Sequence, residues 1–350
     1  MFADILSGND DDTIYSLVPQ VNMFDGQEFY IRLSVNCENN LEEILYKMMF
    51  ENKTLRDVCC INQGIVSGAD YVSEKHLSKY MINANKHDGI FVLDNCNCVD
   101  SEVLEQVEND ENESTVLKSF YKNSDISKYS TLEQTSKRIL FLGKDIANEK
   151  ALSTKYPIIA QHLAKYKQIL VDKRISLHEK PTQWFTLNRG TSHPEVFSKR
   201  KIVCPQRSKS NTFGYNECEW YAASDVFFIT NSEEGYDIKY ILALLNSKLY
   251  YVWLYNKGKR KGETLELTAT PLSEIPLKRP NSEEERLIVS KVDDILSAKR
   301  INKEADTSVL EDRIDFLVYH LYDLTYDEVL VVDPNPPFGR EEYEAYQVEQ

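Results

Sequence analysis

The segment from Asn188 to Ser210, near the middle of the chain, combines the two kinds of side chain that bind DNA. Lys and Arg bind phosphate oxygens and position a protein, whereas amides and the Arg fork distinguish base edges. Arg189 precedes Gly190 at a predicted turn, where its fork can reach a guanine edge. The side chains of this segment that we expect to contact DNA are Asn188, Arg189, Lys199, Arg200, Lys201, Arg207 and Lys209.

Two further loops are candidates for the same interface. A basic run, KGKRK, follows a predicted helix that ends at Gly258. Such a flexible loop suits phosphate contact better than base reading. Its projecting cations are Lys257, Lys259, Arg260 and Lys261. The turn from Gln63 to Gly68 contains two glycines, which allow backbone positions closed to other residues, and a structural need explains them at least as well as a function.

Cysteines and histidines suggest neither a disulfide framework nor a metal site. The seven cysteines are odd in number and irregularly spaced, which is typical of reduced thiols in a cytoplasm. The pairs Cys59-Cys60 and Cys96-Asn97-Cys98 lack the C-x-x-C spacing of a zinc site, and the six histidines are scattered. No stretch approaches the ~20 apolar residues of a membrane span. We expect a cytoplasmic chain with no metal and no membrane partner.

The net charge of −15 is unevenly distributed along the chain. From Lys155 to Ser210 there are 12 basic and 3 acidic residues, and the remaining chain carries 29 basic and 53 acidic residues. A chain polarised in this way has one face suited to a polyanion and other faces that repel it. The alternative is internal charge pairing, in which the basic stretch neutralises the acidic body.

The elements that must position these residues predict an α+β fold. Short strands are expected at 58–61, 89–93, 139–142, 184–187, 201–204 and 226–229. Pro157 suits the first turn of one embedded helix, and Asp237 is the predicted N-cap of another. After Pro280 the pattern is helical, and Ser282 and Glu285 predict a capping box.

These patterns predict a β-rich domain with embedded helices, followed by a C-terminal helical segment. Residues 1–54 form a lead-in segment with a strand from Gln27 to Ser34 and a helix from Leu41 to Phe50. Residues 55–280 form this β-rich domain, 281–330 the helical segment, and 331–350 an irregular tail.

Several pieces in this order resemble a known family. LRDVCCINQGIVSGADYVSEKHL (Leu55 to Leu77) and KIVCPQRS (Lys201 to Ser208) look like parts of the TaqI-like C-terminal specificity domain. That domain occurs in type IIG restriction–modification enzymes and related adenine-N6 DNA methyltransferases. The similarity is strongest in YAASDVFFIT (Tyr221 to Thr230), and it extends to IDFLVYHLYDLTYDEV (Ile314 to Val329). The resemblance implies a module that grips duplex DNA and selects the sequence to be modified.

Motifs for the chemistry itself are not visible in this chain. The glycine-rich turn of a methyltransferase would contain G-x-G, which is absent. Asn335-Pro336-Pro337-Phe338 matches the string that binds a flipped adenine, but only twelve residues follow it and no cofactor-binding domain precedes it. We interpret it as a Pro-rich tail. Glu51-Asn52-Lys53 is half of a nuclease motif without a partner strand.

We therefore expect no catalytic residues and no cofactor in this chain. The resemblance implies S-adenosylmethionine and Mg²⁺ only in an associated methyltransferase or nuclease domain, in cis or in trans. The leading hypothesis is a sequence-specific double-stranded DNA recognition module. The alternative is an acidic protein-interaction factor or DNA mimic. The net charge of −24 outside Lys155 to Ser210 supports this alternative, and the net charge of +9 within that segment opposes it.

Overall fold

The computed structural model describes residues 24–25, 30–31, 39–179, 181–231 and 235–346. Most of the strand predicted from Gln27 to Ser34 lies outside these residues. Within them, β1 (Phe24–Asp25) pairs with β2 (Tyr30–Ile31). The predicted helix that follows is confirmed as α2 (Asn39–Met49). None of the helices in the described ranges is long and apolar enough to cross a membrane.

An antiparallel sheet of four strands forms the centre of the molecule, in the order β12-β10-β14-β4. Its strands are β4 (Cys59–Gln63), β10 (Lys201–Pro205), β12 (Gly214–Asn216) and β14 (Val226–Asn231). Because side chains alternate across a strand, both faces of this sheet present apolar residues. Ile202 and Ile229 belong to one hydrophobic core, and Val203 and Phe228 belong to the other. The sheet is therefore a partition between two cores.

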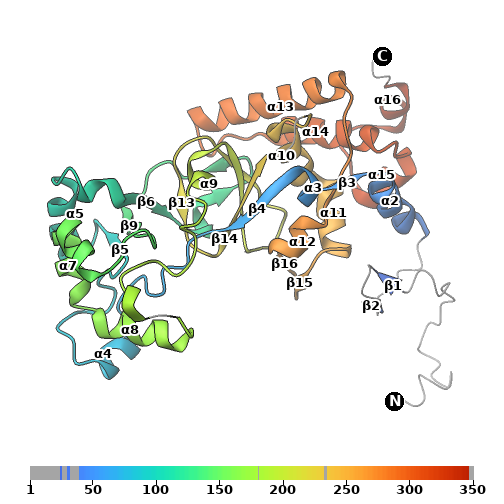
Figure 1. Ribbon diagram of the computed structural model, residues 1–350. Coiled ribbons are helices and arrows are strands. Elements are labelled where there is room, and N and C mark those ends of the chain that lie inside the picture. Colours follow the sequence, from blue (N-terminus) through green and yellow to red (C-terminus); the bar gives the residue numbers. More distant parts are fainter. Residues whose placement is uncertain (1–23, 26–29, 32–38, 180, 232–234, 347–350) are drawn as a thin grey trace, which may run out of the picture.

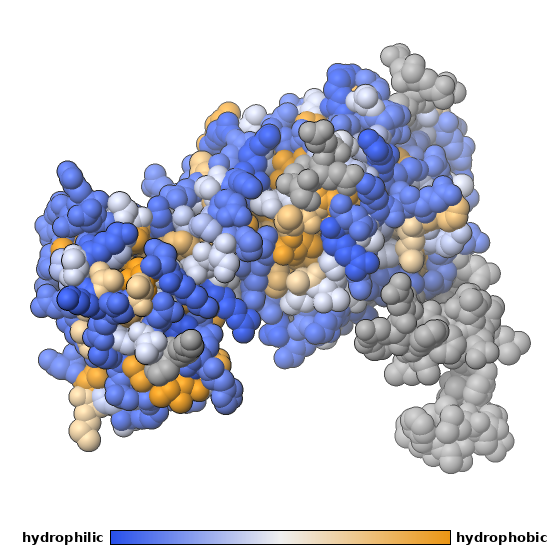
Figure 2. Space-filling view, viewed as in Figure 1, coloured by the Kyte–Doolittle hydropathy of each residue, from blue (hydrophilic) through white to orange (hydrophobic). Residues whose placement is uncertain are grey.

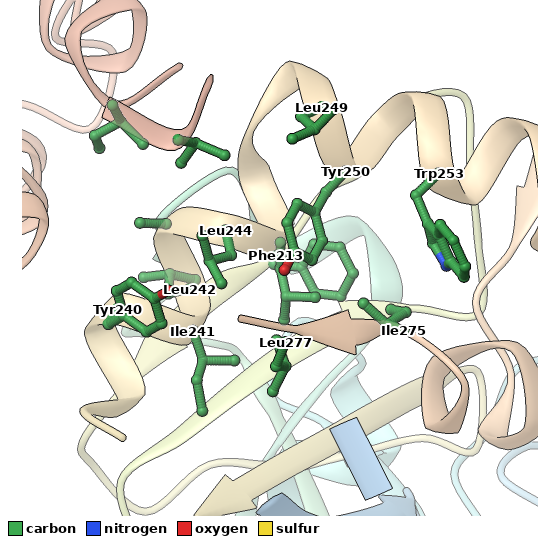
Figure 3. Packing of buried hydrophobic residues seen from close by; sticks show 14 of the residues in the cluster. Phe213, Tyr240, Ile241, Leu242, Leu244, Leu249, Tyr250, Trp253, Ile275 and Leu277 are labelled. Atoms are coloured by element: carbon green, nitrogen blue, oxygen red, sulfur yellow. The ribbon is translucent and has the colours of Figure 1, made fainter. Parts of the chain in front are cut away.

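The first core lies between this sheet and helices from both ends of the chain. Figure 3 shows Tyr240, Leu244, Tyr250 and Leu277 within this core, and all four side chains are fully buried. Burial of each such leucine stabilises the fold by about 1.5–3 kcal/mol. The helices on this side, besides α2, are α10 (Ile238–Asn246), α11 (Lys248–Asn256), α13 (Ser282–Ile301), α14 (Ser308–Leu321), α15 (Tyr326–Val332) and α16 (Arg340–Ala345).

The second core fills a lobe on the other side of the central sheet, at the left of Figure 1. Its own sheet has the order β13-β6-β9-β5, made of β5 (Val92–Asp94), β6 (Leu117–Tyr121), β9 (Lys137–Leu140) and β13 (Tyr221–Ala222). The lobe's helices are α4 (Glu74–Lys79), α5 (Cys98–Glu108), α6 (Glu149–Lys155), α7 (Pro157–Ala164) and α8 (Lys167–Ser176).

Short elements connect these parts. They are β3 (Lys53–Thr54), β7 (Ile126–Ser127), β8 (Ser130–Thr131), β11 (Arg207–Ser208), β15 (Arg260–Lys261), β16 (Thr264–Glu266), β17 (Pro276–Leu277), α3 (Leu55–Val58), α9 (Glu195–Ser198) and α12 (Ala269–Ser273). Three 3-10 turns lie at Glu113–Val116, Asn123–Asp125 and Pro181–Gln183.

The α+β prediction is confirmed, with corrections to individual elements. The strand predicted at 184–187 is wrong: Trp184 and Phe185 are buried, but the segment forms turns. The capping box lies one residue earlier than predicted, with Asn281 as the N-cap and Glu284 as its partner. The predicted irregular tail from 331 contains the end of α15 and all of α16.

Candidate nucleic-acid interface

Loops that are far apart in the sequence meet at one end of the central sheet, which we call the loop end. β4 ends there at Gln63, β10 ends there at Pro205, and β14 begins there at Val226. A bridge between Val66 and Arg189 brings the basic segment to the same place. The fold therefore assembles the loop end from three distant parts of the chain.

Main-chain hydrogen bonds fix the loops at this end. The Val66 N–H donates to the Arg189 carbonyl (3.2 Å), and the Val66 carbonyl accepts from the Asn188 N–H (2.8 Å). The Gly64 N–H donates to the Val226 carbonyl at 2.9 Å. Main-chain groups thus join the loops directly.

Glycines make this close approach possible. A Cβ on Gly64 would lie 2.2 Å from the carbonyl oxygen of Ala223, well inside contact distance. Gly190 and Gly68 each have a φ of +97°, which favours glycine. Backbone packing and a positive φ therefore explain the glycines of the turn from Gln63 to Gly68, without a role in binding.

A pocket of about 330 Å³ opens between the end of β4 and the loop that begins at Asn188. Its polar lining consists of Asn62, Gln63, Lys144, Asn188, Arg189, Thr191, Ser192 and His193. No carboxylate lines it. Arg189 is exposed at this pocket and forms no ion pair with any described residue. The pocket combines positive charge with amide and hydroxyl groups.

A small basic sheet, β11-β16-β15, adjoins the loop end. Arg207 Nη2 lies 3.2 Å from Glu266 Oε1, and Lys259 Nζ lies 3.0 Å from Glu266 Oε2. The hydrogen bond from Lys259 is the largest cause of a lowered pKa for the Glu266 carboxyl. Arg260 lies over the Tyr255 ring at 3.9 Å. One carboxylate thus serves two cations, so the small sheet keeps an excess of positive charge.

The strand β15 lies at an edge of the molecule that is hollowed. Figure 1 places β15, which carries Arg260 and Lys261, at the lower edge of the molecule, and α8 and α4 extend from the lobe toward the same edge. Figure 2 shows an indentation along this edge between the lobe and the rest of the molecule. Lys209 is exposed just after β11. The predicted cations Arg189, Arg207 and Lys259 to Lys261 therefore belong to one end of the fold.

The predicted cations at 199–201 lie elsewhere. They stand at the opposite end of β10, roughly 13 Å from the loop end for four residues of strand. Lys201 is fully buried, and its ammonium donates to the carbonyls of Lys199 (3.0 Å) and Cys218 (2.6 Å) and to Asn216 Oδ1 (3.0 Å). Burial lowers the pKa of Lys201 to about 8. The expectation that Lys201 contacts DNA is wrong, because its donors are used inside the protein.

Two other predicted residues differ from expectation. Only 13% of the Lys257 side chain is exposed, and its Nζ lies 3.8 Å from Glu42 Oε2, so it does not project from the loop. Asn188 is 6% exposed, and its Nδ2 is buried without a hydrogen-bond partner among the described residues. Lys199 and Arg200 are exposed, and their contact with DNA stays a prediction.

Asn62 and Lys144 were not predicted, although both line the pocket. Asn62 comes directly before the Gln63 turn, and that adjacency was the available signal. Lys144 is distant in the sequence from both loops, and only the folded chain brings it to Arg189.

The structure also locates the motifs considered for catalysis. Phe338 of the Asn-Pro-Pro-Phe string is buried edge-on against Phe316, so its ring is not available to stack on a base. Across the described ranges, no group of three or more His, Cys, Asp or Glu could hold a metal ion. His162 is buried, and Nε2 lies 3.0 Å from the Ile90 carbonyl, which is a structural role.

Residues 118–277 match the family model of the TaqI-like C-terminal specificity domain. The resemblance inferred from sequence motifs is thus confirmed over this range, which includes Lys201 to Ser208 and Tyr221 to Thr230. Leu55 to Leu77 and Ile314 to Val329 lie outside the matched range.

Relatives and solved structures extend this likeness. The type II methyltransferase M.MjaIV of Methanocaldococcus jannaschii is 22% identical over 271 residues, which are 77% of this chain and 80% of that protein. M.HindII of Haemophilus influenzae is 32% identical over 151 residues, 41% of this chain but 28% of that protein.

Two solved restriction enzymes are also similar. They are the type IIL restriction–modification enzyme MmeI in complex with DNA (TM-score 0.49, 17% identity) and the type IIG endonuclease BpuSI (TM-score 0.41, 12% identity). The alignments cover 84% and 81% of this chain, and 35% and 33% of those proteins. The chain thus spans about a third of each solved relative.

Proposed function

We propose that this chain recognises a specific duplex DNA sequence for a restriction–modification system. The observation that carries the proposal is the arrangement of the loop end. Arg189, Arg207 and the β15 cations come from separate loops of a TaqI-like specificity domain and lie at one end of its sheet. Cations gathered on one side of an acidic molecule suit a polyanion, because the other faces repel it.

The finer proposal is a division of labour within a type IIG system that methylates adenine at N6. This chain selects the sequence, and a methyltransferase or nuclease domain, in cis or in trans, performs the chemistry. S-adenosylmethionine and Mg²⁺ then belong to that other domain. The proposal includes a cytoplasmic location, where chromosomal DNA is the substrate.

Salt-dependent binding tests this function directly. Each phosphate that the protein neutralises contributes about 0.9 to the slope of log affinity against log salt. The triple variant Lys259→Gln/Arg260→Gln/Lys261→Gln should therefore weaken binding to all duplexes and reduce the slope by up to about 3. Fluorescence anisotropy of a labelled duplex over a range of salt concentrations measures both.

The matched control neutralises three cations on the opposite side of the molecule. Lys291→Gln/Arg300→Gln/Lys303→Gln changes charge equally on and just after α13, which lies at the upper edge in Figure 1. Its slope should equal that of the wild type. Equal weakening in both triple variants would show that net charge, rather than a docking surface, governs binding. No binding by the wild-type chain at low salt would favour the acidic DNA-mimic alternative.

A further inference from the structure

We infer that the pocket beside Arg189 reads a purine step in the major groove, with the Asn62 amide placed on an adenine. The inference rests on the proposed function and names the bases that this site distinguishes. Asn62 is half-buried on β4, and its side chain forms no hydrogen bond with any described residue. An amide held at a pocket wall in this state offers one donor and one acceptor, side by side.

The neighbouring amides are already used or out of reach. Gln63 donates one of its two Nε2 N–H groups to the Ser224 carbonyl at 2.7 Å, so its amide is tied to the loop end. Asn188 is too deeply buried to meet a base edge, and its amide packs against Gly68. Asn62 is therefore the amide of this pocket that is neither fully buried nor hydrogen-bonded to another described residue.

The pattern of donors and acceptors selects the bases. In the major groove, adenine presents the N7 acceptor beside the N6 amino donor, which matches an amide. Guanine presents two acceptors, O6 and N7, which match the two parallel donors of the Arg189 fork. Because Asn62 and Arg189 line the same pocket, the two bases lie on neighbouring or next-neighbouring base pairs.

The surroundings of Asn62 and Arg189 favour recognition of bases over non-specific electrostatic binding to DNA. None of the lining residues is a carboxylate that could pair with Arg189, and the Glu195 carboxylate lies 3.4 Å from Nδ1 of the lining residue His193. Asn62 lies on a paired strand, opposite Phe228, and Arg189 lies in a loop fixed by main-chain bonds to Val66. A site on rigid backbone keeps its base-contacting side chains preorganised in the free protein. Discrimination between bases requires such preorganisation.

Sequence selection from a random duplex library tests the inference on the full-length chain. The wild-type chain should select a site that contains adenine next to or one step from guanine. Asn62→Ala should reduce the preference for that adenine about ten-fold or more, while binding to unrelated duplex and its salt slope stay unchanged. Asn335→Ala, which removes an exposed amide between α15 and α16, is the matched control and should leave every position unchanged.

Two further measurements separate base reading from a general loss of fit. Replacing the adenine by 7-deazaadenine removes N7, so it should weaken wild-type binding but not Asn62→Ala binding. Asn62→Asp keeps the shape but removes the donor, and it should shift the preference toward cytosine, whose amino group a carboxylate accepts.

The outcomes distinguish the two proposals. If the wild-type chain selects no sequence, the proposed function fails. If it selects a sequence whose base preferences are the same in Asn62→Ala and Asn62→Asp, the function stands and this inference fails. Equal sensitivity of wild-type and Asn62→Ala chains to 7-deazaadenine would also overturn it.

Discussion

Lys201 shows why charge in a sequence does not locate an interface. It belongs to a run of three cations, yet it alone is buried, because β10 begins at Lys201 whereas Lys199 and Arg200 precede the strand and are exposed. The acceptors that surround it come from residues 199, 216 and 218, and the last two are brought there only by the pairing of β10 with β12. The run of charges predicts DNA contact for all three cations, because it does not show which acceptors the fold brings to Lys201.

The buried ammonium makes a prediction for stability. Lys201→Met fills the same space but removes the ammonium donor from the Lys199 and Cys218 carbonyls and leaves Asn216 Oδ1 with only the Cys218 N–H. We expect the free energy of unfolding to fall by about 2–4 kcal/mol, since each buried acceptor left unpaired costs about 1–3 kcal/mol. Urea unfolding of the variant measures this decrease. Lys199→Met, at an exposed position, should stay within about 0.5 kcal/mol of wild type.

Arg189 and Asn62 differ in how clearly the sequence alone indicates a role at the site. The Arg-Gly pair signals a turn, and the turn does expose the guanidinium, because Gly190 takes the positive φ. Asn62 gives no such signal, since an asparagine on a strand is ordinary in sequence. Its meaning arises from the pocket that a distant loop builds beside it.

Apolar periodicity predicts which helices exist better than it predicts where they begin and end. The apolar stripe from Ile241 to Trp253 in the sequence predicts one buried helix face, and these residues are buried. The stripe spans two helices, because Ser247 is extended and its hydroxyl accepts from the Tyr250 N–H to start α11. The stripe that begins at Ile159 is likewise shared by α7 and α8. A continuous stripe fixes which face is buried, whereas a break depends on local hydrogen bonds.

The segment at 184–187 shows the limit of the same reasoning. Its residues are nearly all apolar and buried, which is typical of a central strand, but the chain turns within the lobe. The buried Arg174 guanidinium donates to the Thr186 carbonyl, a partner that a strand neighbour would otherwise supply. Burial alone therefore does not separate a strand from a buried turn.

The loop end depends on glycine at the tip of β4. In Gly64→Ala the new Cβ would lie 2.2 Å from the Ala223 carbonyl oxygen, so the two loops must separate. We expect the free energy of unfolding to fall by about 2 kcal/mol or more, and sequence preference to weaken at the same time. Urea unfolding and site selection report the two effects.

Gly339→Ala provides the comparison for that variant. A Cβ at Gly339 has no neighbour within 4 Å, and its φ is negative. Because Gly339 is the N-cap of α16, where alanine is less favourable, its unfolding free energy should fall by no more than about 1 kcal/mol. Equal behaviour of the two glycine variants would contradict the close packing described for the loops.

At the scale of the whole molecule, the first core crosses the predicted boundary at Pro280. Ile288, Val292 and Ile295 of α13 belong to the same core as Ile241 of α10. The division into a recognition domain and a helical segment stays a prediction from sequence. The packing shows that the two parts share one core, which no local pattern of residues could reveal.

This shared core predicts the result of truncation. A chain that ends at Pro280 lacks α13 and α14, and the apolar face of α10 is then exposed to water. We expect it to unfold without a cooperative transition or to aggregate, whereas the full-length chain unfolds cooperatively. Thermal unfolding followed by circular dichroism and size-exclusion chromatography distinguish the two. A cooperative transition in the shortened chain would show that 55–280 is independent.

The loops around Gly64 and Gly190 are joined by peptide groups, so the outward side chains of Asn62 and Arg189 carry no share of the framework. Such a framework allows the base-contacting side chains to change while the backbone stays the same. Point substitutions at these positions would therefore change the recognised DNA sequence without destabilising the fold. The same separation makes residues 62 and 189 the first places at which to retarget it by hand.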